Sequence, residues 1–251
     1  PPVAFVMDTG SVGIIASPDN FTPGPNARNL GPGVQIYTSS GRVENGTWYT
    51  AQQFIYRGDT LVAVAEVPVL QVTSVTCLPD ARDCQPSDHP TGIALMGIGF
   101  ARENTTQPDP ATHGPDYNAF LNLTQVRLTP DGPLQPLPAD WHTGYVVTSE
   151  GVELGLTADN TAGAGLIKLL PDPTYSTPRH TEWVATPMVI DVNGASGAGT
   201  VLFDTGVGYG ILTPPDGAPL GSLVPCPPPI SNSDCLPDGA VIAVSLPGDT
   251  D

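Results

Sequence analysis

Hydrophobic residues along this chain come in short runs, with Gly, Pro and Asp in the segments around them. Residues 61–65 and 240–244 are two examples. Runs of this length between turn residues are typical of β-strands, and no long segment has the apolar spacing of an amphipathic helix. The 30 prolines and 28 glycines agree with many turns. The pattern therefore predicts an all-β protein.

One pattern occurs twice: an apolar run that ends in Asp-Thr-Gly, then small residues, a second apolar run and a proline. The first copy contains Asp8 and the second Asp204, and an alignment without gaps places Ile15 on Ile211. We interpret each copy as a buried strand, a tight turn that presents a carboxylate, and a strand leading away. One Asp-Thr-Gly alone is weak evidence, but two copies with matched flanks point to a duplicated site.

With these two motifs the chain resembles the pepsin-like aspartic proteases, in which each of two lobes contributes one Asp-Thr-Gly loop. The resemblance implies a bilobal fold with pseudo-twofold symmetry, with an N-terminal lobe over residues 1–163 and a C-terminal lobe over residues 164–251. The order of elements matches over roughly residues 3–214. Family members continue further after the second motif, so we expect the second lobe to be incomplete here.

The resemblance makes Asp8 and Asp204 the catalytic pair of a peptidase with an acidic optimum. Two carboxylates held close together cannot both ionise cheaply, so they share one proton over an acidic range. The ionised member deprotonates a water while the protonated member hydrogen-bonds the peptide carbonyl. This chemistry needs no metal and no cofactor, and the implied partner is a peptide or protein substrate.

Other residues of the two motifs would support this pair. By resemblance, the threonines cross-link the loops, the glycine N–H groups bond the carboxylates, and the serine hydroxyl supports the first aspartate. These residues are Thr9, Gly10, Ser11, Thr205 and Gly206. The second copy has Val207 where many family members have Ser or Thr, which removes a hydrogen bond worth about 1 kcal/mol.

A hairpin is predicted at residues 38–41, which lie between two runs of alternating apolar residues. A hairpin at this point of the family is the flap, and it carries a Tyr before its tip, so Tyr37 is the candidate substrate-binding residue. An ordinary cross-strand aromatic is the alternative. Leu95-Met96-Gly97 matches the apolar pair and glycine that lie beneath the first Asp loop in the family. A short helix is expected at residues 118–124.

The four cysteines form two close pairs, Cys77 with Cys84 and Cys226 with Cys235. Local disulfides that close surface loops fit this spacing and imply an oxidising compartment. A zinc site is the alternative, although neither pair has Cys-x-x-Cys spacing. Four glycosylation sequons fit a secreted chain in an organism that glycosylates: Asn20, Asn45, Asn104 and Asn122.

The net charge of −17, with only 8 Lys plus Arg, argues against nucleic acid and against anionic membrane surfaces as partners. We find no membrane span, and we expect that a secretory leader has been removed from this secreted chain. A rival hypothesis is an inactive pepsin-like module in an extracellular assembly. In that case open sheet edges would allow self-association.

Overall fold

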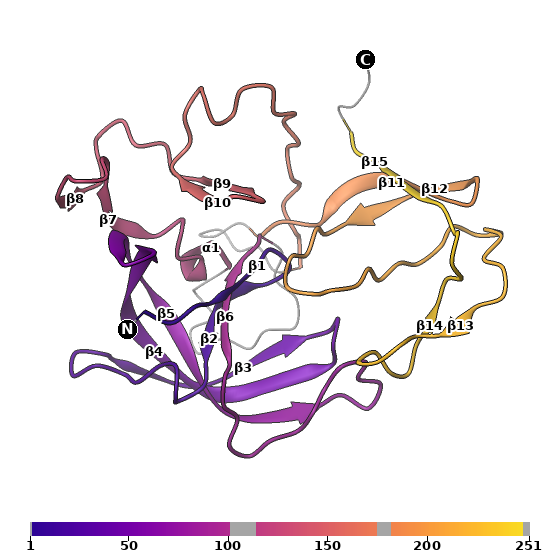
Figure 1. Ribbon diagram of the computed structural model, residues 1–251, viewed down its shortest axis with the longest axis horizontal. Coiled ribbons are helices and arrows are strands. Elements are labelled where there is room, and N and C mark those ends of the chain that lie inside the picture. The colour runs from indigo at the N-terminus through magenta and orange to yellow at the C-terminus, as the bar shows by residue number, and fades with distance from the viewer. Residues whose placement is uncertain (1, 101–113, 175–181, 248–251) are drawn as a thin grey trace.

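The computed structural model describes residues 2–100, 114–174 and 182–247. Within these ranges the chain forms fifteen strands and one helix, Gly114–Tyr117 (α1), which confirms the all-β prediction. No helix there is long and apolar enough to cross a membrane. Figure 1 shows most early strands in indigo and purple on one side and the last strands in orange and yellow on the other.

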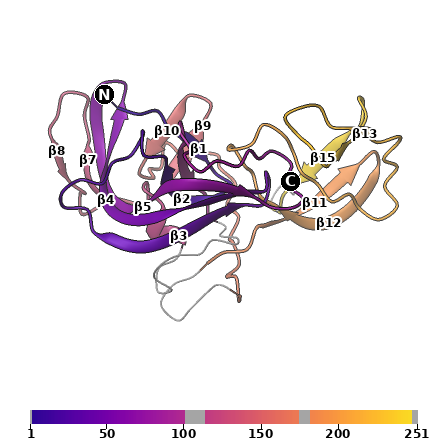
Figure 2. The same cartoon turned by 90° about the horizontal axis from the view of Figure 1, so that it is seen from below.

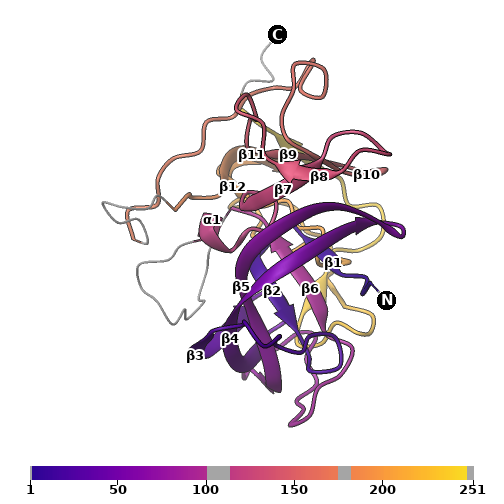
Figure 3. The ribbon, with the colours of Figure 1, turned by 90° about the vertical axis from the view of Figure 1, so that its left-hand side faces the viewer.

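The largest sheet has eight strands, all from residues 6–136. Its main order is β1-β6-β2-β5-β4-β3; β7 also pairs with β5, and β8 pairs with β7. The strands are β1 (Val6–Asp8), β2 (Val12–Ala16), β3 (Asn29–Tyr37), β4 (Arg42–Arg57), β5 (Thr60–Cys77), β6 (Ala94–Ile98), β7 (Leu123–Arg127) and β8 (Leu134–Pro136). Figure 3 shows β5, β2 and β6 next to one another, with α1 at one end.

Both faces of this sheet carry apolar residues, because successive side chains of a strand point to opposite faces. In β5, Val67 and Val69 belong to one core cluster, whereas Leu70 and Val72 belong to the other. Trp48 in the second cluster is fully buried. Strands β4 and β5 are 16 and 18 residues long. Their length fits a sheet that packs against both core clusters.

Strand β6 lies between β1 and β2 and brings Gly97 against the first Asp-Thr-Gly loop. Gly97 pairs with Asp8 in the parallel ladder and with Gly13 in the antiparallel ladder. A Cβ at Gly97 would lie 2.6 Å from the backbone nitrogen of Val12 and 2.7 Å from Oγ of Ser11. The close approach therefore requires glycine, and it fixes the backbone that presents Asp8.

The remaining strands form three small sheets. Figure 2 shows β11 to β15 at one end of the molecule, away from β7 and β8. The sheets are β9 (Tyr145–Thr148) with β10 (Gly151–Leu154), β12 (Ala195–Val201) with β11 (Thr186–Val192) and β15 (Ile242–Ser245), and β13 (Val224–Pro225) with β14 (Asp234–Cys235).

The helix prediction for residues 118–124 is wrong. Helix α1 ends at Tyr117, and β7 begins at Leu123. The side-chain oxygen of Asn118 accepts a hydrogen bond from the backbone N–H of Phe120 at 2.9 Å, and its Nδ2 donates to the carbonyl of Ile98 at 3.0 Å. Local bonds of this kind compete with helical hydrogen bonds, so the chain turns at Asn118 instead of continuing the helix.

Both predicted disulfides are present, Cys77–Cys84 and Cys226–Cys235. The zinc alternative for these cysteines is therefore wrong. Two disulfides within one chain are consistent with an extracellular protein.

Candidate functional site

The two Asp-Thr-Gly loops contact each other through their threonines. Thr9 Oγ1 donates to the carbonyl of Phe203 at 2.6 Å and accepts a bond from the backbone N–H of Thr205 at 3.0 Å. The reciprocal bonds run from Thr205 Oγ1 to the carbonyl of Met7 at 2.8 Å and from the N–H of Thr9 to Thr205 Oγ1 at 3.2 Å. Each loop therefore fixes the backbone of the other.

The glycines of the motifs let the two carboxylates approach the opposite loop. A Cβ at Gly206 would lie 2.5 Å from Cγ of Asp8, and a Cβ at Gly10 would collide with the carboxylate of Asp204. Each glycine N–H also donates to the aspartate of its own loop, at 2.7 Å from Gly10 to Asp8 and 2.6 Å from Gly206 to Asp204. Asp8 and Asp204 therefore lie side by side.

The surroundings of the two aspartates differ. Asp8 is buried at 3% exposure and accepts a 2.5 Å hydrogen bond from Ser11 Oγ. Asp204 is only half-buried, and Val207 provides no hydroxyl in its loop. Burial raises the pKa of Asp8 to about 6; the Ser11 bond lowers this pKa, while the hydrogen bond and charge of Asp204 raise it. Asp8 is therefore the better placed of the two to hold a proton.

A cavity of about 520 Å³ opens beside the pair. Its walls come from the first Asp loop, the β3–β4 hairpin, the segment before β6, and the second Asp loop with the residues that follow it. Both aspartates line it, as do Gly10, Ser11 and Gly206. The cavity thus gives a small molecule or a side chain access to the two carboxyl groups.

Tyr37 ends β3 at the hairpin and lines this cavity. It pairs across the hairpin with Arg42. Its hydroxyl is buried and has no hydrogen-bond partner within the described part of the chain. Burial raises the pKa of Tyr37, and the charges of Asp8 and Glu44 add to the effect. The residue selected from the sequence therefore faces the same space as Asp8.

The tip of this hairpin is bonded to the second half of the chain. Tyr209 donates its hydroxyl to the carbonyl of Ser39 at 3.2 Å. Arg82, inside the first disulfide loop, donates Nη1 to the carbonyls of Thr38 at 3.2 Å and Ser39 at 3.4 Å. Its Nε donates to Ser233 Oγ, inside the second disulfide loop, at 3.2 Å. The hairpin thus covers the cavity with its tip held on two sides.

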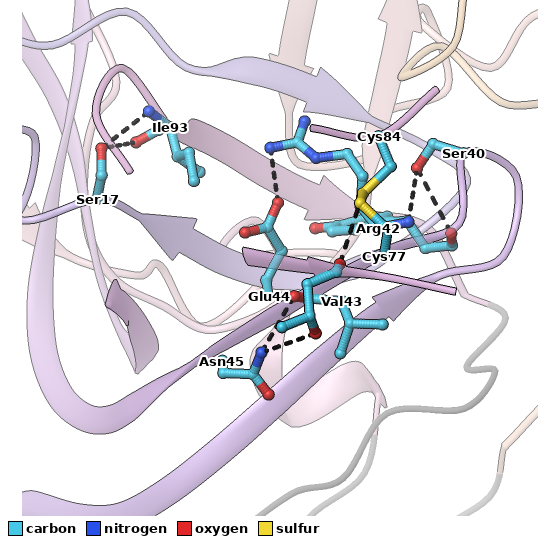
Figure 4. Close-up of polar contacts among 11 residues, drawn as sticks. Ser17, Ser40, Arg42, Val43, Glu44, Asn45, Cys77, Cys84 and Ile93 are labelled. Carbon is cyan, nitrogen blue, oxygen red and sulfur yellow. Dashed lines mark hydrogen bonds and ion pairs between the residues drawn. A yellow bond between two sulfur atoms is a disulfide. The ribbon is translucent and has the colours of Figure 1, made fainter. Parts of the chain in front are cut away.

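The sequence analysis did not select the polar cavity residues of the hairpin strands, Gln35, Arg42 and Glu44. Gln35 pairs with Glu44, and Tyr37 pairs with Arg42, so all four residues share one face of the hairpin. Figure 4 shows Arg42 and Glu44 on one side of β4, joined by an ion pair of 2.8 Å. A signal was present, because Gln35 lies two positions before Tyr37 and must share its face.

Three of the four sequons lie in the described residues, and Asn104 lies outside them. The amides of Asn20 and Asn45 donate hydrogen bonds to backbone carbonyls at 3.1 and 3.2 Å. Asn122 Nδ2 donates to the carbonyls of Pro115 at 2.6 Å and Asn118 at 2.9 Å. A glycan on this nitrogen would replace one of the two hydrogens, so a sugar at Asn122 is incompatible with both bonds.

Within residues 2–100, 114–174 and 182–247, no cluster of three or more His, Cys, Asp and Glu side chains could hold a metal ion. Comparison with known proteins gave no match to a family model, to a curated protein or to a solved structure. We therefore infer the function from the geometry of the site.

Proposed function

We propose that this chain is an aspartic endopeptidase of the pepsin-like, bilobal type, with Asp8 and Asp204 as its catalytic residues. The observation that carries the proposal is the reciprocal bonding of Thr9 and Thr205, which brings the two aspartates together beside a cavity. The duplicated motif and this reciprocal bonding together support a pseudo-twofold arrangement of the two loops.

Asp8 would act first as the acid and Asp204 as the base, because Asp8 is the more buried group and its pKa is raised to about 6. Asp204 takes a proton from water as the water oxygen attacks the peptide carbonyl carbon. Asp8 gives its proton to the carbonyl oxygen, and a tetrahedral diol forms. The C–N bond then breaks as Asp204 returns its proton to the nitrogen and Asp8 regains one from a diol hydroxyl.

The substrate would be an extended peptide that lies between the two halves under the β3–β4 hairpin, with its backbone bonded as an added strand. Tyr37 would flank the bond to be cleaved. The net charge of −17 suits an acidic medium, where protonation of carboxylates reduces self-repulsion. Together with the two disulfides, this supports a secreted enzyme that works at acidic pH.

The experiment is cleavage of a mixture of extended peptides at about pH 3–5, the carboxyl titration range, with products identified by mass spectrometry. The proposal predicts cleavage that pepstatin inhibits and that Asp8→Asn and Asp204→Asn each remove. Asp59→Asn, in an exposed turn, is the matched control and should keep full activity. Cleavage that persists in both active-site variants would rule out this mechanism.

The second candidate is a non-catalytic module that binds peptides or assembles with other chains outside the cell. The observation that favours it is Val207, which leaves Asp204 without the hydroxyl bond that Asp8 receives from Ser11. A module of this kind would bind an extended peptide and return it uncleaved at every pH. Self-association through open sheet edges belongs to the same hypothesis and stays a prediction.

A further inference from the structure

The hairpin presents two buried acceptors to the cavity beside Asp8. Gln35 is 3% exposed and Glu44 is 1% exposed, and both line the cavity. Oε1 of Gln35 and Oε2 of Glu44 have no hydrogen-bond partner within the described residues. Because these two residues are direct cross-strand partners, the two free oxygens belong to neighbouring side chains on one face.

Buried acceptors without a partner are costly, and buried polar groups in folded proteins are nearly always satisfied. One oxygen of Glu44 has a partner, since Oε1 forms an ion pair with the guanidinium of Arg42 at 2.8 Å. The other oxygen, Oε2, has none within the described residues. Burial raises the pKa of this carboxyl, although the charge of Arg42 lowers it. A ligand that brings N–H donors into the cavity would satisfy both acceptors.

The net negative charge of the cavity favours a ligand whose donor group is positively charged. Its described lining contains four carboxyl groups, those of Asp8, Glu44, Asp83 and Asp204, and one cationic side chain, Arg42. Even with one proton shared between Asp8 and Asp204, negative charge exceeds positive charge. A cationic side chain is therefore favoured over a neutral amide, since complementary potential attracts it and stabilises it there.

We propose that this cavity is a specificity pocket for a basic residue, Lys or Arg, of the peptide substrate, next to the scissile bond. The inference rests on the proposed peptidase function. The ammonium or guanidinium group would donate to the free oxygens of Glu44 and Gln35, with Tyr37 beside its aliphatic part. Arg42 bonds only Oε1 of Glu44, and its side chain is 40% exposed, so Oε2 stays open to the ligand.

The test uses peptides of one sequence that differ only in the residue before the scissile bond: Lys, Gln, norleucine or Glu. At about pH 6 ordinary carboxyl groups are ionised, and about half of the molecules still hold the proton on Asp8. At this pH kcat/KM for the Lys peptide should exceed that for the norleucine peptide by at least about tenfold. Glu44→Gln should remove this preference, so that the ratio of kcat/KM for the Lys peptide to kcat/KM for the norleucine peptide falls to about one. Glu66→Gln, at an exposed position of β5, is the matched control and should keep the preference.

Binding gives a second readout that does not depend on catalysis. Calorimetry with Asp204→Asn protein should show tighter binding of the Lys peptide than of the norleucine peptide by a similar factor. Equal kcat/KM for both peptides, or an unchanged Lys preference in Glu44→Gln, would overturn the pocket assignment and leave the peptidase proposal standing. If no peptide is cleaved, the peptidase proposal fails, and equal binding of the two peptides would then overturn the pocket as well.

Discussion

Thr9 and Thr205 lie 196 residues apart in the chain, and each hydroxyl is bonded to the loop of the other. Each threonine donates to a carbonyl beside the other motif and accepts from the other's backbone N–H. These four reciprocal hydrogen bonds, which we call the threonine clamp, fix the separation of the two loops. The positions of Asp8 and Asp204 follow from that separation.

Removal of one hydroxyl from this clamp should destabilise the protein. Thr9→Val loses the bond to Phe203 and the bond from the N–H of Thr205, at about 1 kcal/mol for each bond. Urea denaturation should show a loss of about 2 kcal/mol, and Thr9→Val with Thr205→Val should lose less than the sum of the single variants. Thr200→Val, at an exposed position of β12, is the control; additive effects would argue against a shared clamp.

A methyl group added at Gly206, between the two Asp loops, should stop catalysis and have little effect on the rest of the fold. In Gly206→Ala the new Cβ would lie 2.5 Å from Cγ of Asp8, so the aspartates must separate. We expect kcat to fall by about 100-fold or more, as when a positioned acid or base is lost. Gly210→Ala is the matched control, because no atom lies within 4 Å of its Cβ position. Equal activity of the two variants would contradict the close approach.

The raised pKa of Asp8 predicts that wild-type stability falls as pH rises. The folded state holds this proton to about pH 6, whereas the unfolded chain loses it near 3.8, so the folded protein binds more protons between these values. The stabilisation is complete below about pH 4 and lost above about pH 6, and it amounts to at most about 3 kcal/mol.

Asp8→Asn removes this dependence, so at pH 7 the variant should be more stable than wild type by up to about 3 kcal/mol. At pH 4 the two proteins should be nearly equal. Urea denaturation at both pH values provides the measurement, and Asp59→Asn serves as the exposed control. If the variant were less stable than wild type at pH 7, ionisation of Asp8 would not destabilise the folded protein, which contradicts the prediction.

Arg82 should limit the motion of the hairpin over the cavity. Arg82→Ala loses the bonds to Thr38, Ser39 and Ser233, so the hairpin tip is no longer bonded to the first disulfide loop by this side chain. Hydrogen exchange at residues 38–42 should become faster, because local opening costs less free energy. Arg57→Ala, at the exposed end of β4, should leave that exchange unchanged; unchanged exchange in Arg82→Ala would mean that other contacts hold the tip.

The pairing of Asp8 with Asp204 was expected from the resemblance of the two repeated Asp-Thr-Gly motifs to the paired loops of the pepsin-like aspartic proteases. The strand content was also predictable, since short apolar runs between turn residues have few other solutions. The helix at residues 118–124 was not, because the hydrogen bonds of Asn118 to Ile98 and Phe120 depend on a strand 20 residues earlier.

Glu44 and Gln35 could not be selected from composition, since a polar residue in a strand usually faces solvent. Gln35 could still be placed on the face of Tyr37 from its spacing of two residues, whereas the position of Glu44 became clear only with the hairpin register that pairs it with Gln35. The unequal burial of Asp8 and Asp204 was also hidden, because the two motifs are nearly identical and differ in what packs around them.

The proposed function depends most on the sharing of a proton between Asp8 and Asp204, and a carboxyl titration tests this sharing directly. Carbon-13 NMR of labelled aspartates can follow Asp8 in wild-type protein and in Asp204→Asn. We predict a pKa of about 6 in the wild type, and a clearly lower value in the variant that remains above the ordinary 3.8 because burial persists. An identical Asp8 pKa in both proteins would contradict the pair.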